Sequence, residues 1–159
     1  MDADGLNAAA QLLAEGKPFP HPAGELGVTP HPGEMARLTG LSAAALAADR
    51  EDAALRYAKV WNAVVVLKGA RTVVASPDGR MCVNPPGKPG LARGGSGEVL
   101  AGMLAALLAC GLPAYQAAAC AVYLHGAAAD RAAAKRGEYG MLPHDILPEL
   151  GALFAENQR

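Results

Sequence analysis

The chain has 159 residues, of which 52% are hydrophobic and 18% are charged, and its formal net charge is −1. This length fits one domain spanning residues 1–159, and the hydrophobic content excludes global disorder. The near-neutral charge, with no basic stripe along the chain, argues against nucleic-acid binding. Because no stretch of membrane-spanning length is free of Gly, Pro or charge, we also expect no membrane partner.

The three cysteines, Cys82, Cys110 and Cys120, show no metal-ligand or CxxC spacing. An odd number of cysteines does not suggest a disulfide framework. We therefore expect small buried hydrophobic side chains in a reduced compartment, and we expect the protein in the cytoplasm.

The first part of the chain reads as mainly helical. Ser42 is a plausible N-cap for a long helix, in which alanines and leucines recur at helical spacing. The predicted elements are a helix over 5–14, a Pro- and Gly-rich loop over 16–27, a short extended piece over 26–28, a turn over 29–33, a helical turn over 34–38 and the long helix over 42–62.

A continuous apolar run over 63–67, rich in β-branched residues, predicts a strand buried on both faces and hence a parallel sheet. Two further strands are expected over 72–75 and 81–83. The turn Ser76-Pro77-Asp78-Gly79 between them is a hairpin signal.

A Pro/Gly loop over 84–97 leads into the last part of the chain, where helices are expected over 99–110, from Pro113 to about residue 134, and from Pro143 to Phe154. Helices that alternate with short buried strands indicate an α/β fold with a mainly parallel sheet.

The strongest chemical motif is the turn Gly94-Gly95-Ser96-Gly97, which runs into a helix expected to begin at Glu98. The N-terminus of a helix has unpaired N–H groups and partial positive charge, and glycines let an anion approach the backbone, so the turn predicts a phosphate site. It lacks the Gly-Lys-Ser/Thr of a Walker A loop. Glu98 is either a helix-dipole partner or a general base beside the phosphate.

A second motif lies at the end of the apolar strand, where Lys68 is followed by Gly69 and Thr72. Ligands of open α/β sheets bind beyond the carboxyl ends of strands, so Lys68 and Thr72 could meet a nucleotide. The alternative is a solvated lysine at a strand end. His31, held between Pro30 and Pro32, is either a rigidly presented binding residue or part of the plain surface.

Two weaker motifs surround His125 and the N-terminal acids Asp2 and Asp4. The small residues around His125 favour close helix packing over ligand contact. The acids Asp2 and Asp4 are either helix-capping residues or neighbours of a metal–phosphate site.

Taken together and in this order, these segments resemble the ADP/ATP-dependent NAD(P)H-hydrate dehydratases. The matching pieces span residues 2 to about 130. They are Asp-Ala-Asp-x-Leu-Asn, Thr-Pro-His-Pro-Gly-Glu, Leu-Lys-Gly-Ala-x-Thr, Gly-x-Pro-Gly followed by Gly-Gly-Ser-Gly, and Tyr-Leu-His-Gly-x-Ala-Ala-Asp. The resemblance implies a ribokinase-like three-layer αβα fold with a mainly parallel sheet.

The family uses a nucleotide to phosphorylate hydrated NADH or NADPH, and elimination of phosphate then restores the cofactor. The resemblance implies ADP or ATP as the donor and Mg²⁺ with it, with no metal ligand identified in this chain. His31 and Glu98 would contact the hydrate, and Glu98 would be the catalytic residue. The nucleotide would be bound by Lys68, Gly69, Ala70, Arg71, Thr72, Gly94, Gly95, Ser96 and Gly97.

Three departures separate this chain from the family pattern. The family usually has Asp at the position of Glu98, and Asn and Thr at the positions of Lys88 and Arg93. The strands that precede the Asp-Ala-Asp segment in the family are missing, so we expect a homo-oligomer that covers the exposed sheet edge. Two alternative functions follow: a truncated, inactive relative that retains the fold, or another ribokinase-like small-molecule kinase, against which the motifs of His31 and Lys68 argue.

Overall fold

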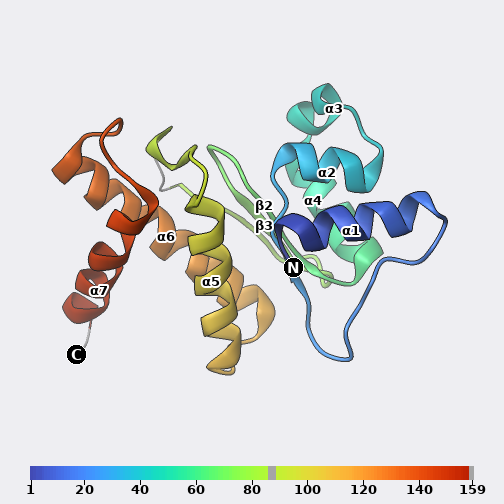
Figure 1. The fold of residues 1–159 in the computed structure, drawn as a ribbon. Coiled ribbons are helices and arrows are strands. Elements are labelled where there is room, and N and C mark those ends of the chain that lie inside the picture. Colours follow the sequence, from blue (N-terminus) through green and yellow to red (C-terminus); the bar gives the residue numbers. More distant parts are fainter. Residues whose placement is uncertain (86–88, 158–159) are drawn as a thin grey trace.

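The structure is a computed structural model that describes residues 1–85 and 89–157 (Figure 1). Lys88 therefore lies outside the described residues. The helices are α1 (Ala3–Ala14), α2 (Pro32–Thr39), α3 (Ala43–Ala48), α4 (Arg50–Trp61), α5 (Ser96–Ala109), α6 (Ala114–Arg136) and α7 (Ile146–Asn157). The strands are β1 (Gly27–Val28), β2 (Val64–Leu67), β3 (Val73–Ala75) and β4 (Met81–Val83), and the 3-10 turns are η1 (Pro89–Leu91) and η2 (Pro143–Asp145).

The strands form one sheet in the order β1-β2-β3-β4. Only β1 and β2 are parallel, with Gly27 opposite Val64, whereas β2–β3 and β3–β4 are antiparallel. The predicted hairpin is confirmed, but the prediction of a mainly parallel sheet is wrong for the described strands. A parallel connection needs a crossover of a dozen or more residues, and the loops that follow β2 and β3 are too short for one.

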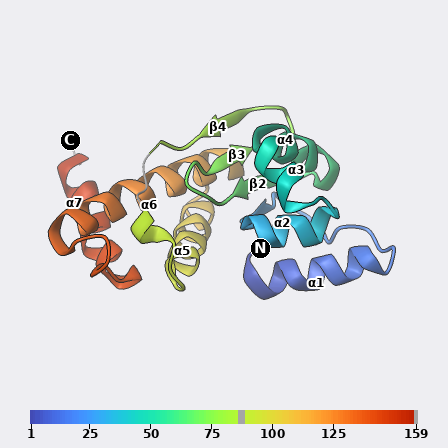
Figure 2. The ribbon, with the colours of Figure 1, turned by 90° about the horizontal axis from the view of Figure 1, so that it is seen from above.

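Helices cover both faces of this sheet, which gives the three layers of an αβα fold. Val65 and Leu67 of β2 point into a core shared with α1, α2 and α4, while Val64 and Val66 pack against α5 and α6. Figure 1 shows the first group of helices on one side of the strands and the second group on the other, and Figure 2 shows α7 beyond α6, away from the sheet. No helix in the described ranges is both long and apolar enough to cross a membrane.

The helix expected over 42–62 is broken into α3 and α4 at Asp49. This residue has φ −144° and ψ 63°, and its carboxylate accepts a hydrogen bond from the N–H of Asp52, so it caps α4. The expectation of buried cysteines is wrong for Cys110, which is exposed because it follows the last residue of α5.

The first residue of the chain lies along the outer edge of β1. The Met1 amino group donates to the Gly27 carbonyl at 2.7 Å, and the Thr29 N–H donates to the Met1 carbonyl at 3.1 Å. This is the alternating pattern of a parallel bridge. It places Asp2, the residue just before α1, beside the carboxyl end of β1.

Candidate functional site

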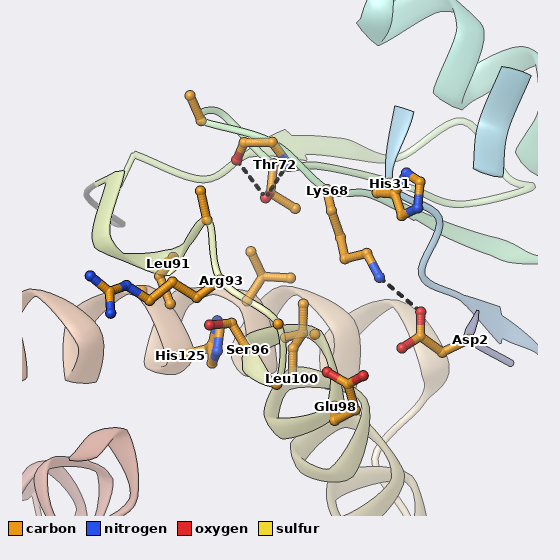
Figure 3. A pocket seen from close by; sticks show the side chains of 18 of the residues that line it. Asp2, His31, Lys68, Thr72, Leu91, Arg93, Ser96, Glu98, Leu100 and His125 are labelled. Carbon is orange, nitrogen blue, oxygen red and sulfur yellow. Dashed lines mark hydrogen bonds and ion pairs between the residues drawn. The ribbon is translucent and has the colours of Figure 1, made fainter. Parts of the chain in front are cut away.

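A cavity of about 690 Å³ opens beyond the carboxyl ends of β1 and β2 (Figure 3). Its walls come from the start of α1, the start of α2, the loop after β2, the glycine turn before α5, and α6. All the sequence-predicted site residues line it except Arg71. They are His31, Lys68, Gly69, Ala70, Thr72, Gly94, Gly95, Ser96, Gly97 and Glu98. Asp2, Glu34 and Lys68 lie together and form a charged end of the cavity, and the apolar residues Leu91, Leu100 and Val122 also line it.

The glycine turn leads directly into the N-terminus of α5. Gly95 is the N-cap residue, with φ 97°, and α5 begins at Ser96, two residues earlier than expected. The left-handed glycine has no side chain to cover the start of the helix, where the Ser96 N–H donates to the Arg93 carbonyl at 3.3 Å and the next N–H groups, those of Gly97 and Glu98, remain for a ligand. With the partial positive charge of the helix end, these groups make an anion-binding site.

The ammonium group of Lys68 faces the same helix end. A Cβ added to Gly97 would lie 3.4 Å from Lys68 Nζ and 3.9 Å from Asp2 Oδ2, so the absence of a side chain at this position lets α5 start close to the charged pair. A phosphate at the turn would therefore meet both backbone N–H groups and a lysine.

Lys68 is held by two carboxylates from distant parts of the chain. Its Nζ donates to Asp2 Oδ1 at 2.8 Å and lies 3.9 Å from Glu34 Oε2, and its side chain is only 20% exposed. Thr29 Oγ1 also donates to Asp2 Oδ1, at 2.7 Å. Burial opposes ionisation of Asp2, but the hydrogen bonds from Lys68 and Thr29 outweigh it and lower the pKa of this carboxyl.

His31 is fixed by a capping box at the start of α2. Its Nδ1 accepts hydrogen bonds from the N–H groups of Gly33 and Glu34, and Glu34 Oε2 accepts one from the His31 N–H at 2.7 Å. Because Nδ1 is an acceptor, the neutral ring carries its proton on Nε2. The side chain is half-exposed, so the imidazole is rigidly presented at the charged end of the cavity.

The loop that follows β2 is closed by its own threonine. Thr72 Oγ1 donates to the Gly69 carbonyl at 3.1 Å, and the Gly69 N–H donates to Thr72 Oγ1 at 3.3 Å. The Lys68 N–H donates to the Pro30 carbonyl at 2.9 Å, which ties the loop to the end of β1. These bonds explain the spacing between the lysine and the threonine of the motif. Arg71 is exposed and does not line the cavity.

Glu98 is exposed in the first turn of α5. In Figure 3 its carboxylate is turned toward the end of the cavity that holds Lys68 and Asp2. Arg93 does not reach this end, because its Nη2 donates to the Tyr139 carbonyl at 2.5 Å.

His125 forms part of the opposite wall, on α6. It is 7% exposed, and burial lowers its pKa to about 4, while the neighbouring backbone of Ser96 acts in the opposite direction. From the sequence alone, packing was favoured over ligand contact for His125. The role of Asp2 was left open between helix capping and a metal–phosphate site, and Glu34 had no assigned role. The signal for His125 was a polar residue within a run of small buried residues on one helix.

Comparisons with known proteins agree with this geometry. A sequence model of the NAD(P)H-hydrate dehydratase family matches residues 1–151. A bifunctional NAD(P)H-hydrate repair enzyme from Moorella thermoacetica is 50% identical over 147 residues, which cover 92% of this chain and 27% of the relative.

Solved structures of related proteins have the same fold as this chain. The ADP/ATP-dependent NAD(P)H-hydrate dehydratase from Bacillus subtilis, co-crystallised with ATP and Mg²⁺, superimposes with a TM-score of 0.83 at 36% identity, over 88% of this chain and 52% of that one. A ribokinase-like superfamily protein from Enterococcus faecalis gives 0.81 at 28% identity, over 98% and 51%. The predicted ribokinase-like fold is confirmed, and the chain spans about half or less of the length of these relatives.

Proposed function

The chain belongs to the NAD(P)H-hydrate dehydratase family, and on that basis we propose that it takes part in repairing hydrated NADH or NADPH at the expense of ADP or ATP. The observation that carries the proposal is the convergence of Lys68 and the N-terminus of α5 on one cavity. An anion bound there would be stabilised by the helix end and by a lysine ammonium.

In the proposed complex, the nucleotide phosphates bind at Gly94, Gly95, Ser96 and Gly97, and the loop from Lys68 to Thr72 lines the AMP part. The hydrate lies at the charged end, against His31. Lys68 and the backbone N–H groups of α5 then offset the negative charge of the transferring phosphoryl group.

Glu98 is the proposed general base. It takes the proton from the hydroxyl on the hydrated ring carbon, and the oxygen attacks the terminal phosphorus as the bond to the departing nucleotide breaks. Phosphate then leaves the ring carbon, a proton leaves its neighbour, and the double bond returns. Glu places its carboxylate about 1 Å farther out than Asp would, a displacement that can cost about 100-fold in rate.

Mg²⁺ is expected to accompany the nucleotide, and the residues present fit it. Asp2 uses Oδ1 for Lys68 and Thr29 and has Oδ2 on the side of Gly97, and Glu98 supplies a second carboxylate near the same helix end. Mg²⁺ is usually held by one or two carboxylates with phosphate oxygens, where it neutralises developing charge. Within residues 1–85 and 89–157, no three His, Cys, Asp or Glu residues form a group that could hold a metal by themselves.

A second candidate function is nucleotide binding without catalysis. The specific observation in its favour is Glu98, which is exposed and is one methylene longer than the Asp typical of the family. An inactive relative of this kind would keep the anion site and lack the placement of the base.

The assay that tests the proposal measures recovery of NADH from its hydrate in the presence of ADP or ATP and Mg²⁺. The variants are Glu98→Asp and Glu98→Gln, and Glu51→Gln is the matched control, because Glu51 is exposed in the first turn of α4 and does not line the cavity. Turnover by the wild-type chain, lost in Glu98→Gln and kept in Glu51→Gln, supports the dehydratase. Nucleotide binding without turnover, even in Glu98→Asp, supports the inactive relative, and no nucleotide binding rejects both.

Self-association and a cytoplasmic location also remain proposals. Exposed residues of α5, namely Gly102, Ala105, Ala106 and Ala109, form a weakly polar face beside the β1 edge, which a second copy could cover. Light scattering tests this directly, and a monodisperse monomer at working concentration rejects self-association. The free state of all three cysteines is compatible with the reduced cytoplasm.

A further inference from the structure

The glycine turn rests on another part of the chain, residues 138–143, which lead from α6 into η2 and are called the backing segment below. A Cβ added to Gly90 would lie 3.2 Å from the Glu138 carbonyl oxygen, and one added to Gly95 would lie 3.0 Å from Pro143 Cγ. A side chain at either position would press on the backing segment. The loop that carries the turn is therefore in close contact with this segment on both sides of Arg93.

The side chain of Arg93 joins the turn to the backing segment. Its Nη2 donates to the Tyr139 carbonyl at 2.5 Å and to the Glu138 carbonyl at 3.4 Å. In Figure 3 the guanidinium group points away from the charged end of the cavity. The carbonyl of Arg93 accepts a hydrogen bond from the Ser96 N–H at 3.3 Å, so the same residue is also bonded to the start of α5.

The backing segment is itself held in place by bonds that do not involve the turn. Met141 is 1% exposed, and its N–H donates to the Gly137 carbonyl at 3.1 Å. The Leu142 N–H donates to Asp145 Oδ2 at 2.9 Å, and Asp145 Oδ1 forms an ion pair with Arg136 Nε at 2.9 Å. The segment can therefore serve as a fixed support for the turn.

The composition of the turn makes such a support important. Glycines lose more conformational freedom on ordering than any other residue, and this turn contains three of them. A Cβ added to Gly94 would meet nothing within 4 Å, so this residue depends on its neighbours for its conformation. Only molecules whose turn directs the N–H groups of Gly97 and Glu98 toward the anion can bind it, and the apparent affinity falls in proportion to their fraction.

We infer that Arg93 is a positioning residue of the anion site. Its guanidinium group fixes the glycine turn to the backing segment, and through the bond from Ser96 it sets the direction of the first N–H groups of α5. Arg93 then raises the affinity for phosphate without contacting the phosphate. This inference rests on the proposed function and names a residue that orders its anion site before the nucleotide arrives.

The test removes the side-chain contact and measures binding by titration calorimetry, with ADP and with inorganic pyrophosphate, which has phosphates and no nucleoside. Arg93→Ala removes both bonds to the backing segment, whereas Arg93→Lys keeps a long cationic donor. Arg131→Ala is the matched control, because it removes one arginine of α6 that does not line the cavity. Tyr139→Ala is a second control, because its side chain is 94% exposed and its carbonyl stays. Melting temperatures without ligand report whether each variant is folded.

We expect Arg93→Ala to bind ADP and pyrophosphate about 10-fold more weakly than the wild type, as when the fraction of binding-competent turns falls about 10-fold. Arg93→Lys should stay within about 3-fold of the wild type, because an ammonium group still donates to a carbonyl, and both controls within about 2-fold. The N–H groups of Ser96 and Val99 make the bonds that close the turn. Without ligand, their hydrogen exchange should be about 10-fold faster in Arg93→Ala.

Three outcomes overturn the inference and leave nucleotide binding intact. Equal ADP affinity of Arg93→Ala and the wild type would show that the contact does not prepare the anion site. A loss for ADP alone would assign Arg93 to the nucleoside. A loss that disappears at about 1 M salt, with unchanged hydrogen exchange, would mean that the guanidinium charge acts on the phosphate directly. A wild-type chain that binds neither ADP nor pyrophosphate would instead reject the proposed function, and this inference with it.

Discussion

The guanidinium group of Arg50 occupies the space that a side chain at Gly69 would need. A Cβ at Gly69 would lie 2.6 Å from Arg50 Nη1 and 2.8 Å from Cζ. Arg50 is the first residue of α4, and its Nη2 donates to the carbonyls of Leu67 at 3.2 Å and Lys68 at 3.1 Å. One arginine thus fixes the end of β2 from behind the cavity and requires a glycine beside Lys68.

Because of this contact, the effects of substitutions at Gly69 and Arg50 on the free energy of unfolding should not be additive. Gly69→Ala should destabilise the protein by about 1–3 kcal/mol, because the new methyl group meets a partly buried guanidinium. In an Arg50→Ala background the same change should cost at least about 0.5 kcal/mol less, since the obstacle is gone. Urea denaturation of the two single variants and the double variant measures the coupling, and Gly24→Ala is the control, because a Cβ there meets nothing within 4 Å. Strict additivity would contradict the contact.

Lys68 should dominate the affinity for phosphate. Lys68→Met removes a charged hydrogen-bond donor from the anion site and should weaken ADP binding by about 10- to 100-fold. Titration calorimetry measures the change, with Lys59→Met as the control, because Lys59 is exposed in the last turn of α4. Equal affinities of the Lys68→Met and Lys59→Met proteins would show that the phosphates bind elsewhere.

Neighbouring glycines of the turn should respond differently to substitution. Gly95 has φ 97°, and a Cβ there would lie 3.0 Å from Pro143 Cγ, so Gly95→Ala should cost about 1–3 kcal/mol of stability. A Cβ on Gly94 meets nothing within 4 Å, so Gly94→Ala should change stability by less than about 0.5 kcal/mol. Thermal denaturation of both variants checks the difference. Similar melting temperatures for the two would mean that Gly95 does not adopt the left-handed conformation.

Burial of His125 should make the protein sensitive to mild acid. Its pKa is about 4 in the folded protein and near 6.5 in the unfolded chain, so between these values the unfolded chain binds more protons. The free energy of unfolding therefore falls as the pH drops from about 6.5 to 4, by on the order of 1–3 kcal/mol from this group. Denaturation at pH 7 and pH 4.5 should show a smaller loss for His125→Asn than for wild type. An equal loss in both proteins would assign the acid sensitivity to other groups.

The sequence predicted those parts of the site that depend on local chemistry. The glycine turn, the strand that ends at Lys68 and the proline-flanked His31 all come together at one cavity, because each is a short motif at the end of its own element. The hairpin of β3 and β4 was also predictable, since its turn residues have a conformational preference of their own.

The parts that sequence reasoning missed depend on contacts between distant residues. Asp2 bonds Lys68 across 66 positions, and Arg50 reaches the end of β2 across 17, and no local pattern indicates either partner. The antiparallel pairing of β2 and β3 was hidden because a fully buried apolar run looks the same in both kinds of sheet. The break between α3 and α4 had a local signal, the N-cap Asp49, that helical periodicity concealed.

The central claim is that adenine nucleotide phosphates bind between Lys68 and the N-terminus of α5. A crystal structure of this chain grown with ADP and Mg²⁺ tests it most directly. The account predicts the terminal phosphate at the N–H groups of Gly97 and Glu98, within hydrogen-bond distance of Lys68 Nζ. A nucleotide whose phosphates lie away from this turn, or crystals that hold no ADP at saturating concentration, would contradict it.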